Sequence, residues 1–250
     1  MVARHDLVTD EEVRAGLLTA RRGTAFFARK LGKLSYADMD EPSLLPGWNR
    51  RQLIAHVGCN ARAVARLVEW AATGVETPMY PDMEYRNREI EFGATLPPIA
   101  LLNLFDHSAV HLSVEWRDLP DEKWAAEVRT AQGRTVPVSE TVWMRTREVW
   151  PHAIDLDNGA RFTDVPTDVL RRLLTDITGV WATRGNAVAL TVTGGPHDGE
   201  RVGASEDDAT EVSGSLPDLV RWASGRVPAG EASGVVFADG SAAPAAPAWI

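Results

Sequence analysis

The chain has 250 residues, of which 44% are hydrophobic and 24% charged, proportions typical of a soluble globular protein. Its formal net charge of −9 argues against a nucleic-acid-binding protein, which needs a basic face, and no apolar run is long enough to span a membrane. The single cysteine, Cys59, excludes an internal disulfide and is typical of a cytoplasmic protein. Neither composition nor charge fixes the oligomeric state.

The N-terminal part of the chain carries the apolar spacing of several long helices. Residues Thr9–Glu12 predict a capping box, and the helix that follows extends to about Leu34. Asn49 and Gln52 form a second plausible capping box, whose helix ends at Gly74.

Two further long helices follow. Residues 75–96 are irregular apart from a short helix near 85–92, and Pro97 and Pro98 open the third long helix. After a connection over residues 120–137, Ser139 caps a fourth helix that extends to Leu156. Four long helices with one crossover-like connection predict an antiparallel four-helix bundle.

The pattern changes after Gly159. Helices are predicted from Pro166 and from Ser215, strands over 187–193, 200–203 and 210–213, and an extended Ala/Pro-rich tail over 241–247. We therefore predict an α+β chain with two domains. Residues 1–163 form the helical bundle and residues 164–250 form a small α/β domain.

The strongest candidate for chemistry is a set of two histidines and one glutamate. Glu148 and His152 are four residues apart, so they lie on one face of a helix. His56 comes from a helix far earlier in the chain. Together the three side chains can bind one divalent metal ion. Three protein ligands leave a coordination position open, which is the arrangement of a catalytic site.

A rival pair of histidines, His107 and His111, is also four residues apart. Judged on spacing alone this is the better metal motif, because it offers two imidazoles. His107 lies well off the apolar stripe of its predicted helix, however, and His111 lies at the edge of that stripe. The pair therefore indicates a partly solvated helix face.

Two nearby residues complicate the interpretation. Pro151 falls inside the Glu148–His152 turn and removes a helical hydrogen bond, so the helix either bends there or ends at Trp150. Cys59 lies three residues after His56 and could be a nucleophile or a ligand. Most lone cysteines are small buried hydrophobes, and we favour that interpretation.

Several stretches resemble a known family. They are SLLPGW (43–48), LIAHV (53–57), ETPMY (76–80), AQGRTVP (131–137), SETVWMR (139–145), REVW (147–150), VSGSL (212–216) and Gly225-Arg226. Together they span nearly the whole chain and resemble the mycothiol-dependent maleylpyruvate isomerases, members of the DinB-like metal-binding superfamily. The resemblance implies a DinB-like bundle followed by a small α/β domain, with the active cleft between them. Pro151 departs from the family pattern.

The resemblance also implies a site and a reaction. His56, Glu148 and His152 would bind a divalent ion, with zinc the first expectation, and mycothiol would be the thiol cofactor. The reaction would be cis–trans isomerisation of maleylpyruvate to fumarylpyruvate in gentisate degradation, by thiolate addition, bond rotation and elimination. The substrate is a small anion. Arg226 is the first and Arg86 the second arginine implied to hold its carboxylates.

Two alternatives remain open from the sequence. The first is a related mycothiol S-transferase on the same fold, which would conjugate the thiol to another electrophile. The second is a non-catalytic, metal-binding regulatory module, in which His107 or His111 would close the coordination sphere as a fourth protein ligand.

Overall fold

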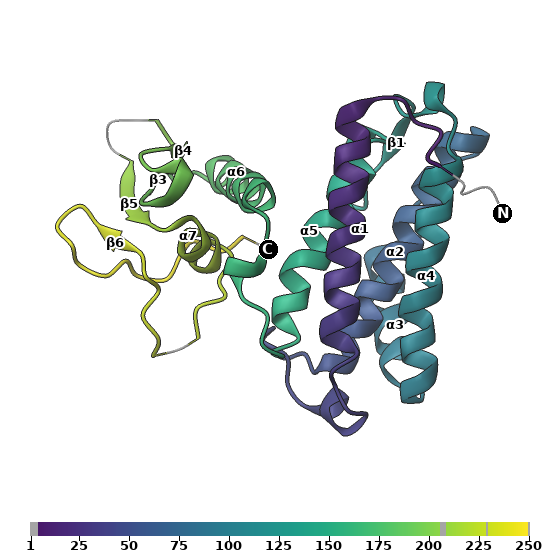
Figure 1. Ribbon diagram of the computed structural model, residues 1–250, viewed down its shortest axis with the longest axis horizontal. Coiled ribbons are helices and arrows are strands. Elements are labelled where there is room, and N and C mark those ends of the chain that lie inside the picture. The colour runs from purple at the N-terminus through teal and green to yellow at the C-terminus, as the bar shows by residue number, and fades with distance from the viewer. Residues whose placement is uncertain (1–4, 206–208, 229, 250) are drawn as a thin grey trace. The chain divides into compact units, whose positions relative to one another are not determined.

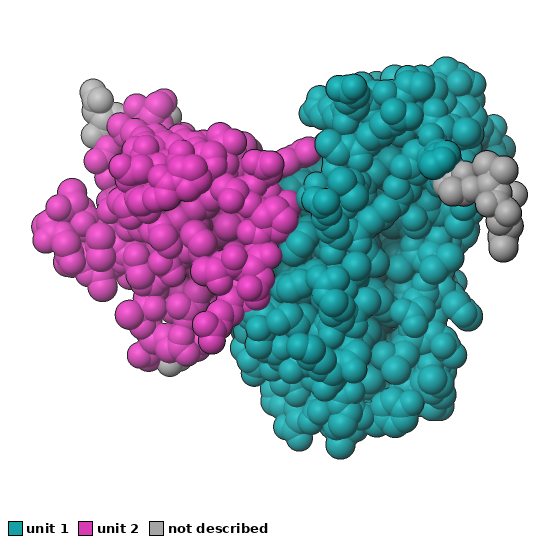
Figure 2. Space-filling model, viewed as in Figure 1, with its two compact units in different colours: residues 1–160 teal, residues 161–250 magenta. Residues whose placement is uncertain are grey.

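The computed structural model describes residues 5–205, 209–228 and 230–249. Its internal contacts divide the chain into two units, residues 1–160 and residues 161–250 (Figure 2). The first unit is helical apart from one two-stranded hairpin, and the second combines two helices with a four-stranded sheet. The predicted α+β class is therefore confirmed. Every helix in the described part of the chain is too short or too polar to cross a bilayer.

The first unit is built on four long helices and one short helix (Figure 1). The long helices are α1 (Glu11–Leu31), α2 (Arg50–Thr73), α4 (Pro98–Asp118) and α5 (Glu140–Asp155), and the short helix is α3 (Met83–Ala94). Two of the long helices run in each direction. Gly16 of α1 faces Val142 of α5 and Gly23 faces Trp150, so α1 and α5 are parallel.

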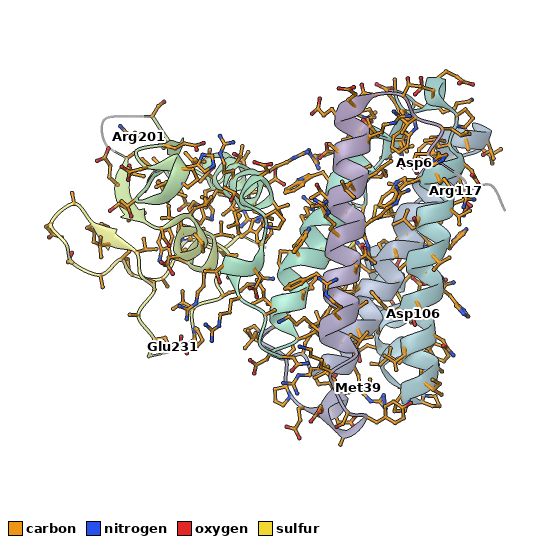
Figure 3. The ribbon with its side chains drawn as sticks, in the orientation of Figure 1. Asp6, Met39, Asp106, Arg117, Arg201 and Glu231 are labelled. Atoms are coloured by element: carbon orange, nitrogen blue, oxygen red, sulfur yellow. The ribbon has the colours of Figure 1, made fainter. Side chains whose placement is uncertain are left out.

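Helices α2 and α4 run in the opposite direction to α1 and α5. Gly58 of α2 faces Phe105 of α4, and Glu69 further along α2 pairs with His111. Helices α2 and α4 are therefore parallel to each other, and a parallel pair needs a long connection. Helix α3 lies within that connection. Figure 3 labels Met39, buried in the 3-10 turn Ala37–Asp40 after α1, and Arg117 in the last turn of α4.

The helix ends test the local predictions directly. The capping box of Asn49 and Gln52 is confirmed, and Gly74 ends α2 in the left-handed conformation with φ of 75°. The predicted box at Thr9–Glu12 is wrong, because Asp10 caps α1 through Val13 N.

Two further boundaries differ from expectation. Helix α1 ends at Leu31, because Gly32 follows it and closes the last turn with its own N–H. Ser139 precedes α5, but its hydroxyl makes no capping hydrogen bond to the helix within the described residues. The connection before it contains the hairpin β1 (Glu127–Arg129) and β2 (Thr135–Pro137), which the sequence did not predict.

The second unit is a mixed sheet packed by two helices. Its elements are α6 (Thr167–Thr183), β3 (Val188–Val192), β4 (Arg201–Gly203), β5 (Thr210–Gly214), α7 (Leu216–Ala223) and β6 (Val236–Phe237). The strand order is β4-β3-β5-β6, with β3 and β5 parallel and the outer pairs antiparallel. Three strands and both helices agree with the prediction, whereas β6 was not expected.

Candidate metal centre

The structure brings the three predicted ligand residues together. One donor atom each from His56, Glu148 and His152 lies within 4.8 Å of the others. His56 Nε2 is 2.9 Å from Glu148 Oε2, and His152 Nε2 is 3.2 Å from the same oxygen. The two imidazole rings meet edge to face, with centroids 5.0 Å apart. All three side chains belong to the first unit.

His56 owes its place to the start of α2. The capping box at Asn49 fixes where the helix begins, and the helix then passes through the middle of the bundle. Every residue from Leu53 to Ala61 is buried, and His56 itself is only 6% exposed. Trp48 packs against the imidazole with ring centroids 5.5 Å apart. The ring is therefore held on two sides.

Helix α5 passes through Pro151 without ending. It is continuous from Glu140 to Asp155, so the alternative of a helix that ends at Trp150 is wrong. Proline removes the hydrogen bond to the carbonyl of Arg147, at a typical cost of about 3 kcal/mol. Burial of Trp150 and of Pro151 itself offsets that cost. Glu148 and His152 consequently share one helical face, as the spacing predicts.

Asp155 supports the predicted ligand residue His152, although its position in the sequence did not single it out. Its Oδ2 accepts a hydrogen bond from His152 Nδ1 at 2.8 Å, and its side chain is fully buried. This leaves His152 Nε2 facing Glu148. A carboxylate behind a histidine is the usual partner of a metal-ligating imidazole, because it fixes the tautomer and the ring orientation. The spacing of His152 and Asp155, three residues apart on one helix, is the sequence feature that could have predicted this contact.

Glu148 is ionised, whereas the two imidazoles differ in how readily they take up a proton. Burial opposes charge on Glu148, but hydrogen bonds with His152 and His56 hold the pKa of Glu148 well below its usual range. Burial lowers the pKa of His56 and keeps its imidazole neutral. Burial opposes protonation of His152 as well, yet its hydrogen bonds with Asp155 and Glu148 raise its pKa. Two imidazoles and one carboxylate are ligands typical of zinc and similar divalent ions.

The two predicted substrate arginines have different surroundings. Arg86, on α3, places Nη2 3.3 Å from His56 Nδ1, and its Nη1 donates to Asn87 Oδ1. It therefore lies directly beside the candidate metal centre. Arg226 belongs to the second unit, where its Nη1 donates to Ser224 O. Its role in binding substrate stays a prediction.

The rival histidines lie elsewhere. His111 Nε2 is 3.4 Å from Glu69 Oε1 and 3.3 Å from Glu115 Oε1, which makes a separate, more exposed group. Among the described residues, the group that contains His56 includes neither His107 nor His111. The fourth protein ligand that a closed regulatory site would require from them is not there.

Cys59 is buried on α2. Its thiol faces the Glu89 carbonyl at 3.9 Å. Burial, together with the charge of Glu89, raises the pKa of Cys59 to about 11. A thiol with that pKa is almost wholly protonated at neutral pH and is a poor nucleophile. The interpretation of Cys59 as a small buried hydrophobe agrees with this environment.

Comparison with known proteins places the chain in a family. A family model described as the mycothiol maleylpyruvate isomerase N-terminal domain matches residues 20–157, and the MDMPI C-terminal domain model matches residues 164–246. The chain belongs to the mycothiol-dependent maleylpyruvate isomerase family. The resemblance inferred from the sequence is thus confirmed across both units.

Solved structures agree with this membership. The crystal structure of the mycothiol-dependent maleylpyruvate isomerase is 45% identical, with a TM-score of 0.87, over 95% of this chain and 97% of that one. A mutant of that isomerase, in which a histidine is replaced by alanine, matches with the same identity, coverage and TM-score. A search of curated proteins found no match. The family is therefore assigned through its domains and its solved structures.

Proposed function

We propose that this member of the maleylpyruvate isomerase family converts maleylpyruvate into fumarylpyruvate with mycothiol as its thiol cofactor, in gentisate degradation. One observation carries the proposal. The convergence of His56, Glu148 and His152 occurs in a chain that is 45% identical, over 95% of its length, to an enzyme named for that activity.

His56, Glu148 and His152 would hold a divalent ion, and we propose zinc. Their donor set fits zinc, because it offers two imidazoles and an ionised carboxylate in a largely buried place. Three ligands leave a coordination position for a small molecule. When bound, the ion supplies a Lewis-acidic centre at which a thiol loses its proton near neutral pH.

The chain's own residues prepare this centre. Asp155 would keep the Nδ1 proton on His152, so that Nε2 can act as a ligand once its own proton is lost. Hydrogen bonds keep Glu148 ionised despite its burial. Arg86, beside His56, is a cation suited to one carboxylate of a dianionic substrate, and Arg226 is our candidate for the other.

The thiol has to come from outside the chain. Cys59, the single cysteine, is buried and protonated, so the chain has no thiolate of its own to take the place of an external thiol. Mycothiol supplies the nucleophile whose addition and later elimination let the substrate's carbon–carbon bond rotate. Because such a cofactor has to stay reduced, we propose that the protein acts in the cytoplasm.

A maleylpyruvate assay tests the function. The purified, zinc-loaded protein is incubated with maleylpyruvate with and without mycothiol, and fumarylpyruvate is measured. Turnover is expected only when mycothiol is present, and its loss is expected when His56→Ala or Glu148→Ala removes a ligand and the bound metal together. Equal turnover without thiol contradicts the proposal. A stable mycothiol conjugate with another electrophile, and no turnover of maleylpyruvate, indicates an S-transferase instead.

A further inference from the structure

A buried arginine joins α5 to α2 beside the candidate metal centre. Arg145 lies three residues before Glu148 on α5 and is only 1% exposed. Its Nη1 donates to Val57 O at 2.7 Å and to Asn60 Oδ1 at 2.9 Å. Val57 directly follows His56. One guanidinium nitrogen therefore links the helix that carries Glu148 to the α2 turn that carries His56.

A second arginine links the same two helices at the other end of the ligand group. Arg50, the first residue of α2, donates from Nε to Leu156 O at 2.7 Å and from Nη2 to Asp157 O at 3.2 Å. These carbonyls follow the last turn of α5, where helical partners are missing. Leu156 is four residues beyond His152. Arg50 thus holds the end of α5 that lies past the ligands.

The two contacts bracket the ligand group along both helices. His56 lies between Arg50 and the Val57–Asn60 turn of α2, and Glu148 and His152 lie between Arg145 and Leu156 on α5. Because α2 and α5 are antiparallel, a slide of one helix against the other would break both sets of hydrogen bonds. Metal ligands have to be held within about 0.5 Å of their productive positions.

We propose that Arg145 and Arg50 are positioning residues for the metal centre. They fix the register of α2 against α5 and thereby hold His56 at its distance from Glu148. The inference rests on the proposed function, because it takes His56, Glu148 and His152 to be the ligands.

The alternative role for Arg145 is purely electrostatic, and it predicts the opposite sign. A buried cation near Glu148 repels a divalent ion, so removal of its charge alone would tighten metal binding. Removal of a positioning contact weakens metal binding. The metal affinity of a variant without the guanidinium therefore distinguishes the two roles.

Replacement of Arg145 by an apolar side chain of similar length is expected to be tolerated. Nη2 of Arg145 is buried without a hydrogen-bond partner among the described residues, and an incompletely satisfied buried charge stabilises a fold little. Methionine has a similar length and no charge. We therefore expect Arg145→Met to fold.

Arg51 offers a matched control. It follows Arg50 on α2, and the two side chains are similarly buried, at 16% and 12% exposed. Arg51 donates from Nε to Asp40 Oδ1 at 2.7 Å and from Nη1 to Leu96 O at 3.1 Å. These partners lie outside α5. The variant Arg51→Met also removes side-chain hydrogen bonds of α2. These two bonds do not connect the helices that carry the ligands.

The test measures Co²⁺ binding by the metal-free full chain, in competition with a chromophoric chelator, for the parent protein and for Arg145→Met, Arg50→Met and Arg51→Met. Arg145→Met and Arg50→Met are expected to bind Co²⁺ about 10-fold more weakly or worse, the usual effect of losing outer support for metal ligands. Arg51→Met should stay within about twofold of the parent. Arg145→Lys keeps the charge, but its side chain is one bond shorter and its nitrogen falls short of the position of Nη1, so binding is expected to weaken as well.

Unchanged or tighter Co²⁺ binding in both Arg145→Met and Arg50→Met overturns the proposal. If circular dichroism shows that either methionine variant is unfolded, the lysine variant at that position decides by the same criterion. A parent protein that binds no Co²⁺ contradicts the ligand group itself, and with it the proposed function. That failure is distinct from one in which the parent binds and the arginine variants match it.

Discussion

At the scale of single residues, the candidate metal centre depends on two kinds of contact, one within a single helix and one between two helices. Glu148 and His152 meet through helical spacing, whereas His56 reaches them only through packing of α2 against α5. Asp155 adds a buried carboxylate behind His152. Each of these side chains is polar and surrounded by apolar residues, so each has a partner in place before any ion binds.

The contact between Asp155 and His152 gives the first prediction. Asp155→Asn removes the charge that supports His152, and we expect metal affinity to fall about 10-fold or more. Asp106→Asn is the control. Asp106 is exposed on α4, outside both helices that carry the ligands, so affinity should not change. Competition titrations of both variants with Zn²⁺ measure the effect. Equal affinities would show that Asp155 does not support the ligand.

Cys59 gives the second prediction. Because its thiol is buried and its pKa is raised to about 11, Cys59→Ala should leave the mycothiol-dependent rate within about twofold of the parent rate. The variant removes one buried sulfur, so a small loss of stability is expected. Initial rates at saturating mycothiol provide the measurement. A rate that drops by orders of magnitude in a folded variant would make Cys59 a reacting group.

At the scale of secondary-structure elements, α5 is placed by a close approach of α1. A Cβ atom at Gly23 would lie 2.6 Å from Trp150 Nε1 and 2.6 Å from Val149 Cγ2. Helix α1 therefore touches α5 at the turn between Glu148 and His152. The same contact buries Trp150 and supports the helix across Pro151.

Gly23→Ala is the third prediction. The added methyl has to displace Trp150 or Val149, and overpacking of this kind costs about 1–3 kcal/mol in unfolding free energy. Gly179→Ala in α6 meets no atom within 4 Å, so it should be neutral or stabilise by up to about 1 kcal/mol. Urea titrations of the two variants measure both. A stabilising Gly23→Ala would mean that α1 and α5 have room between them.

At the scale of the whole molecule, the candidate ligands all belong to residues 1–160, whereas Arg226 belongs to residues 161–250. The metal should consequently stabilise one unit through α2 and α5. The sheet of the second unit carries no residue of the ligand group.

Removal of the metal tests whether it stabilises only the first unit. Chelation should speed amide hydrogen exchange in α2 and α5, because a ligand that binds the native state slows local opening around its site. Exchange in β3 and β5 should be unchanged. Mass spectrometry of peptides from the metal-loaded and chelated protein gives the comparison. An equal loss of protection in both units would contradict a site confined to the ligands named here.

The sequence by itself determined the features that depend on contacts between residues close together in the chain. The box of Asn49 and Gln52 starts α2 through hydrogen bonds between neighbours, and the spacing of Glu148 and His152 follows from helical geometry. The family motifs likewise lie in contiguous stretches, so they needed no structure.

Only the tertiary structure decided which distant groups meet. Arg86 beside His56, and Arg145 reaching from α5 to α2, are contacts between elements that no local pattern encodes. Pro151 is the clearest case, because its local preference favours a break in α5. Packing of Trp150 against α1 offsets that preference, since burial of one large aromatic side chain is comparable in free energy to the cost of a proline inside a helix.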